Sequence, residues 1–443
     1  MREDSSRVSG RLLPLLLLLA VVFAVLLVRS HDAASSSPEP PPDYVADELL
    51  VSFRLPLPPA AVKAIHLAAG AQVLQHEPLA GWYRIRLPQG VDPVETAAFY
   101  NKLPWVKYAE PNYVVRAALV PNDPLYSDKQ AWYYDLINAP AGWDIERGEA
   151  SVIVGVLDTG IDLDHPDLRD KIWTNAREYP PNGLDDDNNG CIDDLHGCNF
   201  LVAPPSTDPS DDHGHGTMVA GIIAARTHNR EGVAGVAWGA TLLPVKVLDS
   251  NGAGTSSDVA QGIIYAARSG ARVINLSMAR SAPSLALEGA VKEAHDTFGA
   301  ILVSAAGNEG HAAVGYPAAY RQVIAVGAFD HNNPVGRASF SNWGPEIAVA
   351  APGVDVFSTY LGDGYAQSQG TSFSAAFVSG LAALLISQDP NRTDDDIRQL
   401  LRFTSVDLPD GDTPNWDGAG RIDIGEALDS RVFQAAVPGL ARP

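Results

Sequence analysis

Three short stretches of the sequence each hold one residue suited to acyl transfer. Asp158 stands in VLDTGID, His215 in HGHGTMVAG and Ser372 in GTSFSAAFVSG. A serine hydroxyl becomes a nucleophile when a base takes its proton, and histidine serves best as that base near neutral pH. A carboxylate that accepts a hydrogen bond from the histidine fixes its tautomer. Together the three residues predict a serine nucleophile with its base and orienting carboxylate.

Taken one at a time, the same residues have ordinary structural explanations. An aspartate after a strand often stabilises a turn, and a histidine or serine at the start of a helix often caps it. The chain order Asp158, His215, Ser372 makes the catalytic interpretation more specific, because it is the order of the subtilisin triad. A lipase-type hydrolase is disfavoured, since the sequence has no Gly-x-Ser-x-Gly motif.

These motifs resemble the signature motifs of the subtilase family over about residues 121–428. The resemblance selects His215 over the nearby His213 and His165, because the family motif is Gly-His-Gly-Thr. A fourth stretch, AAGNEG, carries Asn308, and the resemblance implies that its side chain donates to the oxyanion together with the backbone N–H of Ser372.

The sequence departs from the family pattern beside the expected site. Met218 stands where the family usually has histidine, and FSAAF stands at 373–377 in place of Met-Ala-Ala-Pro-His. These positions pack helices around the site, so we expect altered packing with the chemistry kept. A catalytically silent peptide-binding module on the same fold is the alternative, and a reactive Ser372 would separate the two.

Substrate contacts are also implied by the resemblance. An extended peptide would lie between two segments of the chain by strand addition, and two glycines would line a roomy pocket for the residue before the scissile bond. Broad specificity is expected, with large apolar side chains preferred and a basic one tolerated by Glu309 at the rim. A cis peptide is expected before Pro317. The expected substrate-binding residues are Ser277, Met278, Ala279, Gly252, Ala253, Gly254, Gly307 and Gly315.

The elements that must position these residues follow from the apolar pattern. Runs of β-branched residues, apolar on both faces, alternate with helical stretches from about residue 120 to 428, which predicts a three-layer α/β domain with a parallel sheet. The predicted strands are 152–157, 242–248, 273–276, 301–304 and 323–326. The predicted helices are 217–225, 257–269, 285–297 and 372–386.

Residues 44–119 predict a separate, small α+β domain. Its expected strands are 48–55, 82–87 and 106–115, and its expected helices are 60–69 and 94–103. The stretch AEPNY, which ends at Tyr113, resembles the end of a subtilase propeptide. The resemblance implies a domain that assists folding, inhibits the enzyme and is cut off between Tyr113 and Pro121. A permanent accessory domain is the alternative.

The first 30 residues predict export. Three arginines precede an apolar run from Leu12 to Val28, which suits either a cleaved signal peptide or an uncleaved anchor in the cytoplasmic membrane. A buried core helix is disfavoured, because the run is apolar on every face. A Pro- and Ser-rich linker follows at 31–43, and the tail at 429–443 carries no clear signal.

The sequence holds two candidate calcium sites. DDDNNGCIDD at 185–194 has the D-x-D-x-N-G spacing of a calcium loop, with a solvated acidic loop as the alternative. Its expected ligands are Asp185, Asp187, Asn189 and Asp194, with the Cys191 carbonyl. The second site is implied only by resemblance to thermitase-like subtilases, with Asp123, Asp167 and Asn229 as its ligands.

The two cysteines, Cys191 and Cys198, flank this loop. Related subtilase loops often carry aromatic residues at both positions, so the paired change points to a disulfide, with free thiols or a zinc site using His196 as alternatives. The 31 basic and 53 acidic residues give a net charge of −22, which argues against nucleic-acid binding.

Overall fold

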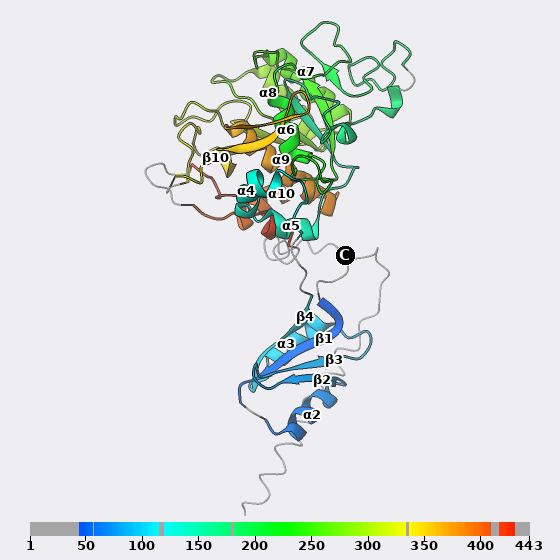
Figure 1. Cartoon of the computed structure of the whole chain (residues 1–443), viewed down its shortest axis with the longest axis vertical. Helices are drawn as coiled ribbons and strands as arrows, with labels where there is room; N and C mark the ends of the chain where they lie inside the picture. Colours follow the sequence, from blue (N-terminus) through cyan, green and yellow to red (C-terminus); the bar gives the residue numbers. More distant parts are fainter. Residues whose placement is uncertain are drawn as a thin grey trace, which may run out of the picture. The chain divides into compact units, whose positions relative to one another are not determined.

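The computed structural model describes residues 44–55, 57–114, 119–178, 181–333, 336–408 and 416–429. The chain divides after Ala117 into two compact units (Figure 1). The predicted export segment at 1–30, the linker at 31–43 and the tail after Asp429 lie outside the described residues.

The N-terminal unit is a four-stranded antiparallel sheet with two helices. The strand order is β2-β3-β1-β4. Leu49, Val51 and Ile85 are fully buried between sheet and helices. Strand β2 was not predicted, because QVLQHE is mostly polar and its side chains are largely exposed. The elements are β1 (Tyr44–Phe53), α2 (Pro59–Ala68), β2 (Gln72–Glu77), β3 (Trp82–Arg86), α3 (Pro93–Asn101) and β4 (Val106–Tyr113).

The larger unit is built on a seven-stranded parallel sheet, with strand order β11-β10-β9-β8-β5-β7-β6. Central strands are buried on both faces, as their continuous apolar sequences predict. The strands are β5 (Ile153–Asp158), β6 (Cys198–Asn199), β7 (Thr241–Lys246), β8 (Val273–Leu276), β9 (Ile301–Ala305), β10 (Val323–Phe329) and β11 (Ile347–Pro352).

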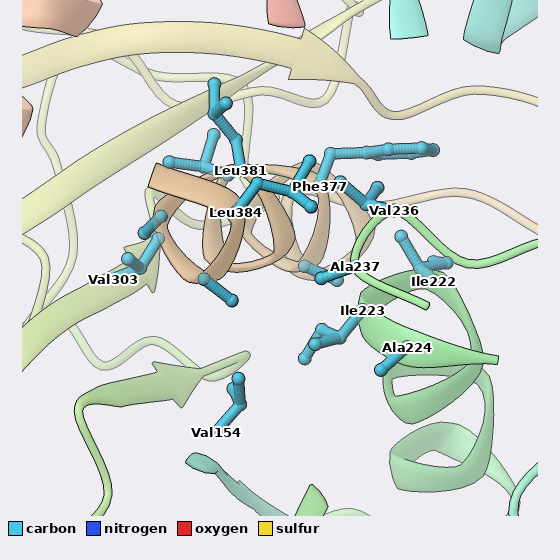
Figure 2. Close-up of a cluster of buried hydrophobic side chains, with 14 of the residues drawn as sticks. Val154, Ile222, Ile223, Ala224, Val236, Ala237, Val303, Phe377, Leu381 and Leu384 are labelled. Carbon is cyan, nitrogen blue, oxygen red and sulfur yellow. The ribbon is translucent and has the colours of Figure 1, made fainter. Parts of the chain in front are cut away.

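Helices cover both faces of this sheet and create two cores. Val154 and Val156 of β5 pack in one core with helices α6 (His215–Ala224) and α9 (Thr371–Gln388). Leu157 packs in the other core with helices α7 (Ser256–Arg268) and α8 (Leu285–Asp296). Figure 2 shows part of the first core, with Phe377, Leu381 and Leu384 on α9, Ile222 and Ile223 on α6, and Ala237 between the two helices. The predicted three-layer α/β fold, preceded by a small α+β domain, is confirmed.

Helix α9 is the core helix of the larger unit. Within the described residues it is the one helix long and apolar enough to cross a membrane, but 89% of its apolar window is buried inside the protein. Shorter elements complete the unit and were not predicted, because their apolar runs are brief. They are α4 (Ala131–Leu136), α5 (Ala139–Ile145), the hairpin β12 (Val356–Tyr360) and β13 (Gly364–Ser368), α10 (Asp394–Thr404) and α11 (Ile424–Leu428).

Local signals fix several helix starts. Thr255 and Asp258 form a capping box on α7, and Ser284 caps α8 by accepting from the Leu287 N–H. The observed helix and strand limits therefore fall within a few residues of the predicted ones. The cis peptide predicted before Pro317 is confirmed.

Candidate active site

Asp158 and His215 meet at the carboxyl edge of the parallel sheet. Asp158 is the last residue of β5 and is fully buried, and His215 is the first residue of α6. The distance between His215 Nδ1 and Asp158 Oδ1 is 2.7 Å. The Thr159 N–H donates to the same carboxylate oxygen at 2.8 Å. This geometry leaves His215 Nε2 as the nitrogen available to a substrate or nucleophile.

The pKa of His215 reflects two opposing causes. Burial lowers it, but the carboxylate of Asp158, which is also hydrogen-bonded to the ring, and the charge of Asp211 outweigh burial and raise it above the ordinary value of 6.5. A histidine in this position becomes a well-stabilised imidazolium when it takes a proton.

Ser372 lies in the first turn of α9 and is 7% exposed. Its hydroxyl donates to the Ser277 carbonyl oxygen at 3.1 Å, and the Ser277 hydroxyl donates to the Ser372 carbonyl oxygen at 2.9 Å. The next residue, Phe373, lies against the His215 ring, with centroids 5.5 Å apart. Phe373 therefore brings Ser372 and His215 to one site, and transfer of the serine proton to the imidazole would need the hydroxyl to turn from Ser277 toward His215.

Asn308 follows β9 and is held by α9. Its Oδ1 accepts from both the N–H and the hydroxyl of Thr371, each at 2.9 Å. Among the described residues its Nδ2 donates no hydrogen bond, and the side chain is exposed. The amide is thus fixed one residue away from Ser372, with its donor free for a ligand.

The expected substrate-binding residues fall in two groups. Ser277 contacts Ser372 directly, and the Gly315 N–H donates to the Ala306 carbonyl, which places Gly315 beside Gly307. A Cβ on Gly315 would stand 2.9 Å from that of Ala279, so glycine keeps this space open. Met278 lies between Ser277 and Ala279 and packs partly on the second core.

The second group, which consists of Gly252, Ala253 and Gly254, forms a tight turn after β7. The Ala253 N–H donates to the Asp249 side chain at 3.0 Å, and Gly252 has a left-handed φ of 71°. Gly252 approaches the ring of His213, whereas a Cβ on Gly254 would clash with the Val247 carbonyl. This turn is therefore brought near the loop that carries His215.

Two contributors to the site were not predicted. Asp211 accepts hydrogen bonds from the loop and first turn around His215. Asn342 donates to Glu309 Oε2 at 2.6 Å and accepts from the Glu309 N–H at 3.0 Å, which holds this side chain beside Gly307. The acidic run before His215 was a usable signal for Asp211, whereas nothing local pointed to Asn342.

The 185–194 loop gathers carboxylates, with one member from outside the motif. Ligand atoms of Glu178, Asp187 and Asp194 lie within 4.8 Å of one another. Asp185 instead accepts from the N–H groups of Asn189 and Gly190 at 3.1 and 3.0 Å. Oxygen donors of this kind suit Ca²⁺.

Asp194 is the most constrained carboxylate of that loop. Burial raises its pKa to about 6 against the hydrogen bonds that it accepts, and the charge of Asp187 adds to the rise. The Asn189 amide donates to it at 2.9 Å, and the Tyr265 hydroxyl donates to the same oxygen. A bound cation would relieve the repulsion between these carboxylates.

The second expected set also comes together. Asp123 Oδ1 accepts from the Asn229 N–H at 3.2 Å, and the Asn229 amide donates to Asp167 Oδ1 at 2.9 Å. Both carboxylates are buried, and burial raises the pKa of each. Two buried carboxylates joined through an amide again fit a hard cation.

Cys191 and Cys198 form a disulfide. It leaves no thiolate for the alternative zinc site, and His196 Nδ1 lies 3.1 Å from the Trp173 carbonyl oxygen. The bridge closes the end of the acidic loop onto β6.

The profile of the subtilase family matches residues 149–420. The chain belongs to the subtilase family. The fervidolysin N-terminal prodomain profile matches residues 30–112 of this subtilase. The chain is therefore a serine peptidase that carries an N-terminal prodomain.

Similar proteins agree with this assignment. A thermophilic serine proteinase from Bacillus sp. (strain AK1) is 39% identical over 365 residues, which cover 82% of each chain. Thermitase from Thermoactinomyces vulgaris is 38% identical, over 70% of this chain and 99% of thermitase. A solved structure of a protease from Pseudoalteromonas arctica PAMC 21717 matches with a TM-score of 0.60 at 32% identity, over 72% of this chain and 100% of that one.

Proposed function

We propose that this subtilase is an exported endopeptidase that cleaves peptide bonds through Asp158, His215 and Ser372. The observation that carries the proposal is the 2.7 Å contact between His215 Nδ1 and buried Asp158, with Ser372 on the adjoining helix α9. Asn308 supplies the free amide donor beside them.

Each group has one role in the reaction. The Ser372 hydroxyl forms a bond to the scissile carbonyl carbon while His215 Nε2 takes its proton, and Asp158 stabilises the imidazolium. The Asn308 amide and the Ser372 N–H hold the negative oxygen of the tetrahedral intermediate. The imidazolium then protonates the leaving amine, and water, activated by the same histidine, releases the acyl group.

Substrate binds in extended form along Ser277–Ala279 on one side and Gly252–Gly254 on the other. Gly307 and Gly315 leave a pocket for a large apolar side chain before the scissile bond. Glu309, held by Asn342, adds tolerance for a basic side chain there. A peptide library that required one small residue at this position would contradict this specificity.

The N-terminal unit acts as the propeptide of this enzyme. It assists folding, inhibits the active site and is removed by a cut between Tyr113 and Pro121. The match of residues 30–112 to a prodomain supports this role. The segment at 1–30 directs export and anchors the chain to the outer face of the cytoplasmic membrane if it is not cleaved.

Calcium stabilises the larger unit, which we call the catalytic unit, at two places. In the first, the predicted ligands Asp185, Asp187, Asn189 and Asp194 bind the ion, and Glu178 joins Asp187 and Asp194. In the second, Asp123, Asp167 and Asn229 bind it. The ion neutralises buried carboxylates at both places and takes no part in peptide hydrolysis.

An intact-mass time course tests the proposal. Residues 31–443 and the Ser372→Ala variant are refolded with calcium and followed in parallel. We expect only the wild type to yield a mature form that begins between Tyr113 and Pro121. If both chains stay whole and a serine-directed fluorophosphonate labels neither, a silent peptide-binding module takes the place of the peptidase.

A further inference from the structure

Asp211 lies in the loop before α6, four residues ahead of His215. Its carboxylate accepts five hydrogen bonds and is thereby saturated. Oδ1 accepts from the Thr159 hydroxyl at 2.8 Å and from the N–H groups of His213 and Gly214, each at 3.0 Å. Oδ2 accepts from the Thr217 N–H at 3.0 Å and from the Thr217 hydroxyl at 2.6 Å.

Thr159 connects this carboxylate to the end of β5. Its N–H donates to Asp158 Oδ1 at 2.8 Å, and its hydroxyl accepts from the Gly216 N–H at 3.0 Å. Two of the donors to Asp211 and Thr159 are backbone N–H groups of the first turn of α6, which have no partner within the helix. One connected network therefore joins the residue after Asp158 to the residues on both sides of His215.

We propose that Asp211 is a positioning residue of this peptidase, which holds His215 against Asp158 by joining Thr159 to the first turn of α6. The inference rests on the proposed catalytic roles of Asp158 and His215. Asp211 contacts neither the nucleophile nor the expected position of the substrate, so it acts through the histidine. A misplacement of the imidazole by about 1 Å is enough to cost about 10²-fold in rate.

The charge of Asp211 also acts on the imidazole. Burial would raise the pKa of Asp211, but the hydrogen bonds it accepts outweigh burial and hold it below the usual range, so the group is ionised wherever the enzyme works. Among the described residues, the titratable groups that act on or contact the His215 ring are Asp158 from β5 and, from its own loop, Asp211 and His213. Helix α9 presents the uncharged Phe373. Loss of the Asp211 charge therefore removes one of two anionic influences on the ring.

Asp211→Asn tests this role in the mature enzyme. The amide keeps one acceptor but turns an N–H₂ toward the donors of Thr217. We expect kcat to fall about 10–100-fold while KM changes little, and the acid limb of the kcat/KM profile to move to lower pH. Asp208→Asn is the matched control, because Asp208 lies in the same loop but accepts only from Ser210 among the described residues, and it should behave as the wild type.

Two outcomes would overturn the role of Asp211. One is an Asp211→Asn enzyme with wild-type kcat. The other is a reduced kcat with an unmoved acid limb, which is the result of a purely structural carboxylate. Failure of the proposed function is separate, because it would appear as activity that survives Ser372→Ala while the wild type is active.

If Asp211→Asn does not mature, Thr159→Val provides a second test of the same network. Valine removes the hydroxyl that joins Asp211 to the Gly216 N–H but leaves the charge of Asp211. We therefore expect kcat to fall and the acid limb of the kcat/KM profile to stay at the same pH. When both variants can be made, the double variant should lose little more than Asp211→Asn alone, because both changes break one network. Fully additive losses, or a Thr159→Val enzyme with wild-type kcat, would contradict the network.

Discussion

Two histidines, one in each unit, have opposite surroundings. In the prodomain, His66 is fully buried among Phe53, Tyr83 and Tyr100, with ring centroids 5.8–5.9 Å away. Its Nδ1 lies 3.2 Å from the Tyr100 hydroxyl, and its Nε2 has no partner among the described residues. No carboxylate contacts the ring there, so burial alone acts and lowers its pKa to about 4.

In the catalytic unit, His215 is partly buried, with its side chain 23% exposed, and its pKa is raised because Asp158 and Asp211 outweigh the effect of burial. One histidine is therefore kept neutral as part of a hydrophobic core, and the other is prepared to accept a proton. The comparison teaches that burial does not decide what a histidine does; the charged partners brought to it do.

The largest contrast is expected from the same substitution at the two positions. His215→Gln should lower kcat of the mature enzyme by about 10⁶-fold, the size of the loss known for the histidine of subtilisin itself. His66→Gln should leave kcat of the mature enzyme unchanged, because the prodomain has been removed. Steady-state kinetics on the two mature forms measures both effects, with the prodomain of His215→Gln removed in trans by active wild-type enzyme that is then separated from it. A large loss of kcat in mature His66→Gln would break the division of roles between the units.

Removal of calcium should destabilise the catalytic unit but not the prodomain. Every candidate ligand lies in the catalytic unit, so chelation should lower its unfolding free energy by about 4 kcal/mol for each site that was filled at a thousand times its dissociation constant. The prodomain should be unaffected. Hydrogen exchange of the Ser372→Ala zymogen, with and without chelator, reports on each unit.

Variants identify which carboxylates respond to calcium. Asp187→Asn and Asp123→Asn should each weaken the effect of the chelator, whereas Asp249→Asn, at a carboxylate outside both candidate sets, should not. A chelator effect of the same size in all three variants would place the cation elsewhere.

Asn308→Ala should cost about 10²–10³-fold in kcat, a range established for the corresponding donor of subtilisin. KM should change little, since the amide acts on the oxyanion that forms during the reaction. Asn391→Ala, at an exposed asparagine of the same unit, is the control. A loss confined to KM would mean that Asn308 binds the ground state.

Acidification should destabilise the prodomain through His66. Its pKa is lowered in the folded state to about 4 from 6.5, so its contribution is present above pH 6.5 and is lost as the pH falls toward 4. The loss amounts to about 3 kcal/mol. Denaturant unfolding of the Ser372→Ala zymogen at several pH values measures it.

His66→Gln should remove this part of the pH dependence, because glutamine does not titrate. His76→Gln should keep it, since His76 is exposed and stacks on Tyr83 with centroids 4.1 Å apart. Equal pH dependence in both variants would assign the acid sensitivity to carboxylates instead.

The smallest expected effect concerns the pH dependence of catalysis. His215 accepts a proton only when neutral, so kcat/KM should fall as the pH decreases through its raised pKa, which lies above 6.5. The pKa of His66 therefore lies below the ordinary histidine value of 6.5, and the pKa of His215 lies above it. An acid limb below pH 6.5 in the wild type would show that the charges of Asp158 and Asp211 do not dominate.

Much of this protein follows from local sequence. The mostly apolar runs at 153–158, 273–276 and 301–305 predict buried parallel strands, because apolar side chains point to both faces of each strand. The positions of Asp158, His215 and Ser372 at strand and helix ends follow from the same pattern, since such ends meet at one edge of the sheet.

Other features depend on residues that are distant in the chain. Glu178 joins Asp187 and Asp194, Asn342 orients Glu309, and Phe373 lies on His215, although no spacing rule relates these residues. Strand β2 forms because β3 supplies its hydrogen bonds, not because its own sequence favours a strand. Such contacts are fixed only when the elements pack.

The sequence by itself therefore determined the chemistry that we propose for the chain, since the proposed nucleophile, base, carboxylate and oxyanion donor are each marked by a short motif. The tertiary structure alone decided how that chemistry is tuned. The hydrogen bond from Thr159 to Asp211 joins separate elements. The pKa of His66 comes from burial, and that of His215 comes from burial and from the charges of Asp158 and Asp211, which only the packed structure brings to the ring.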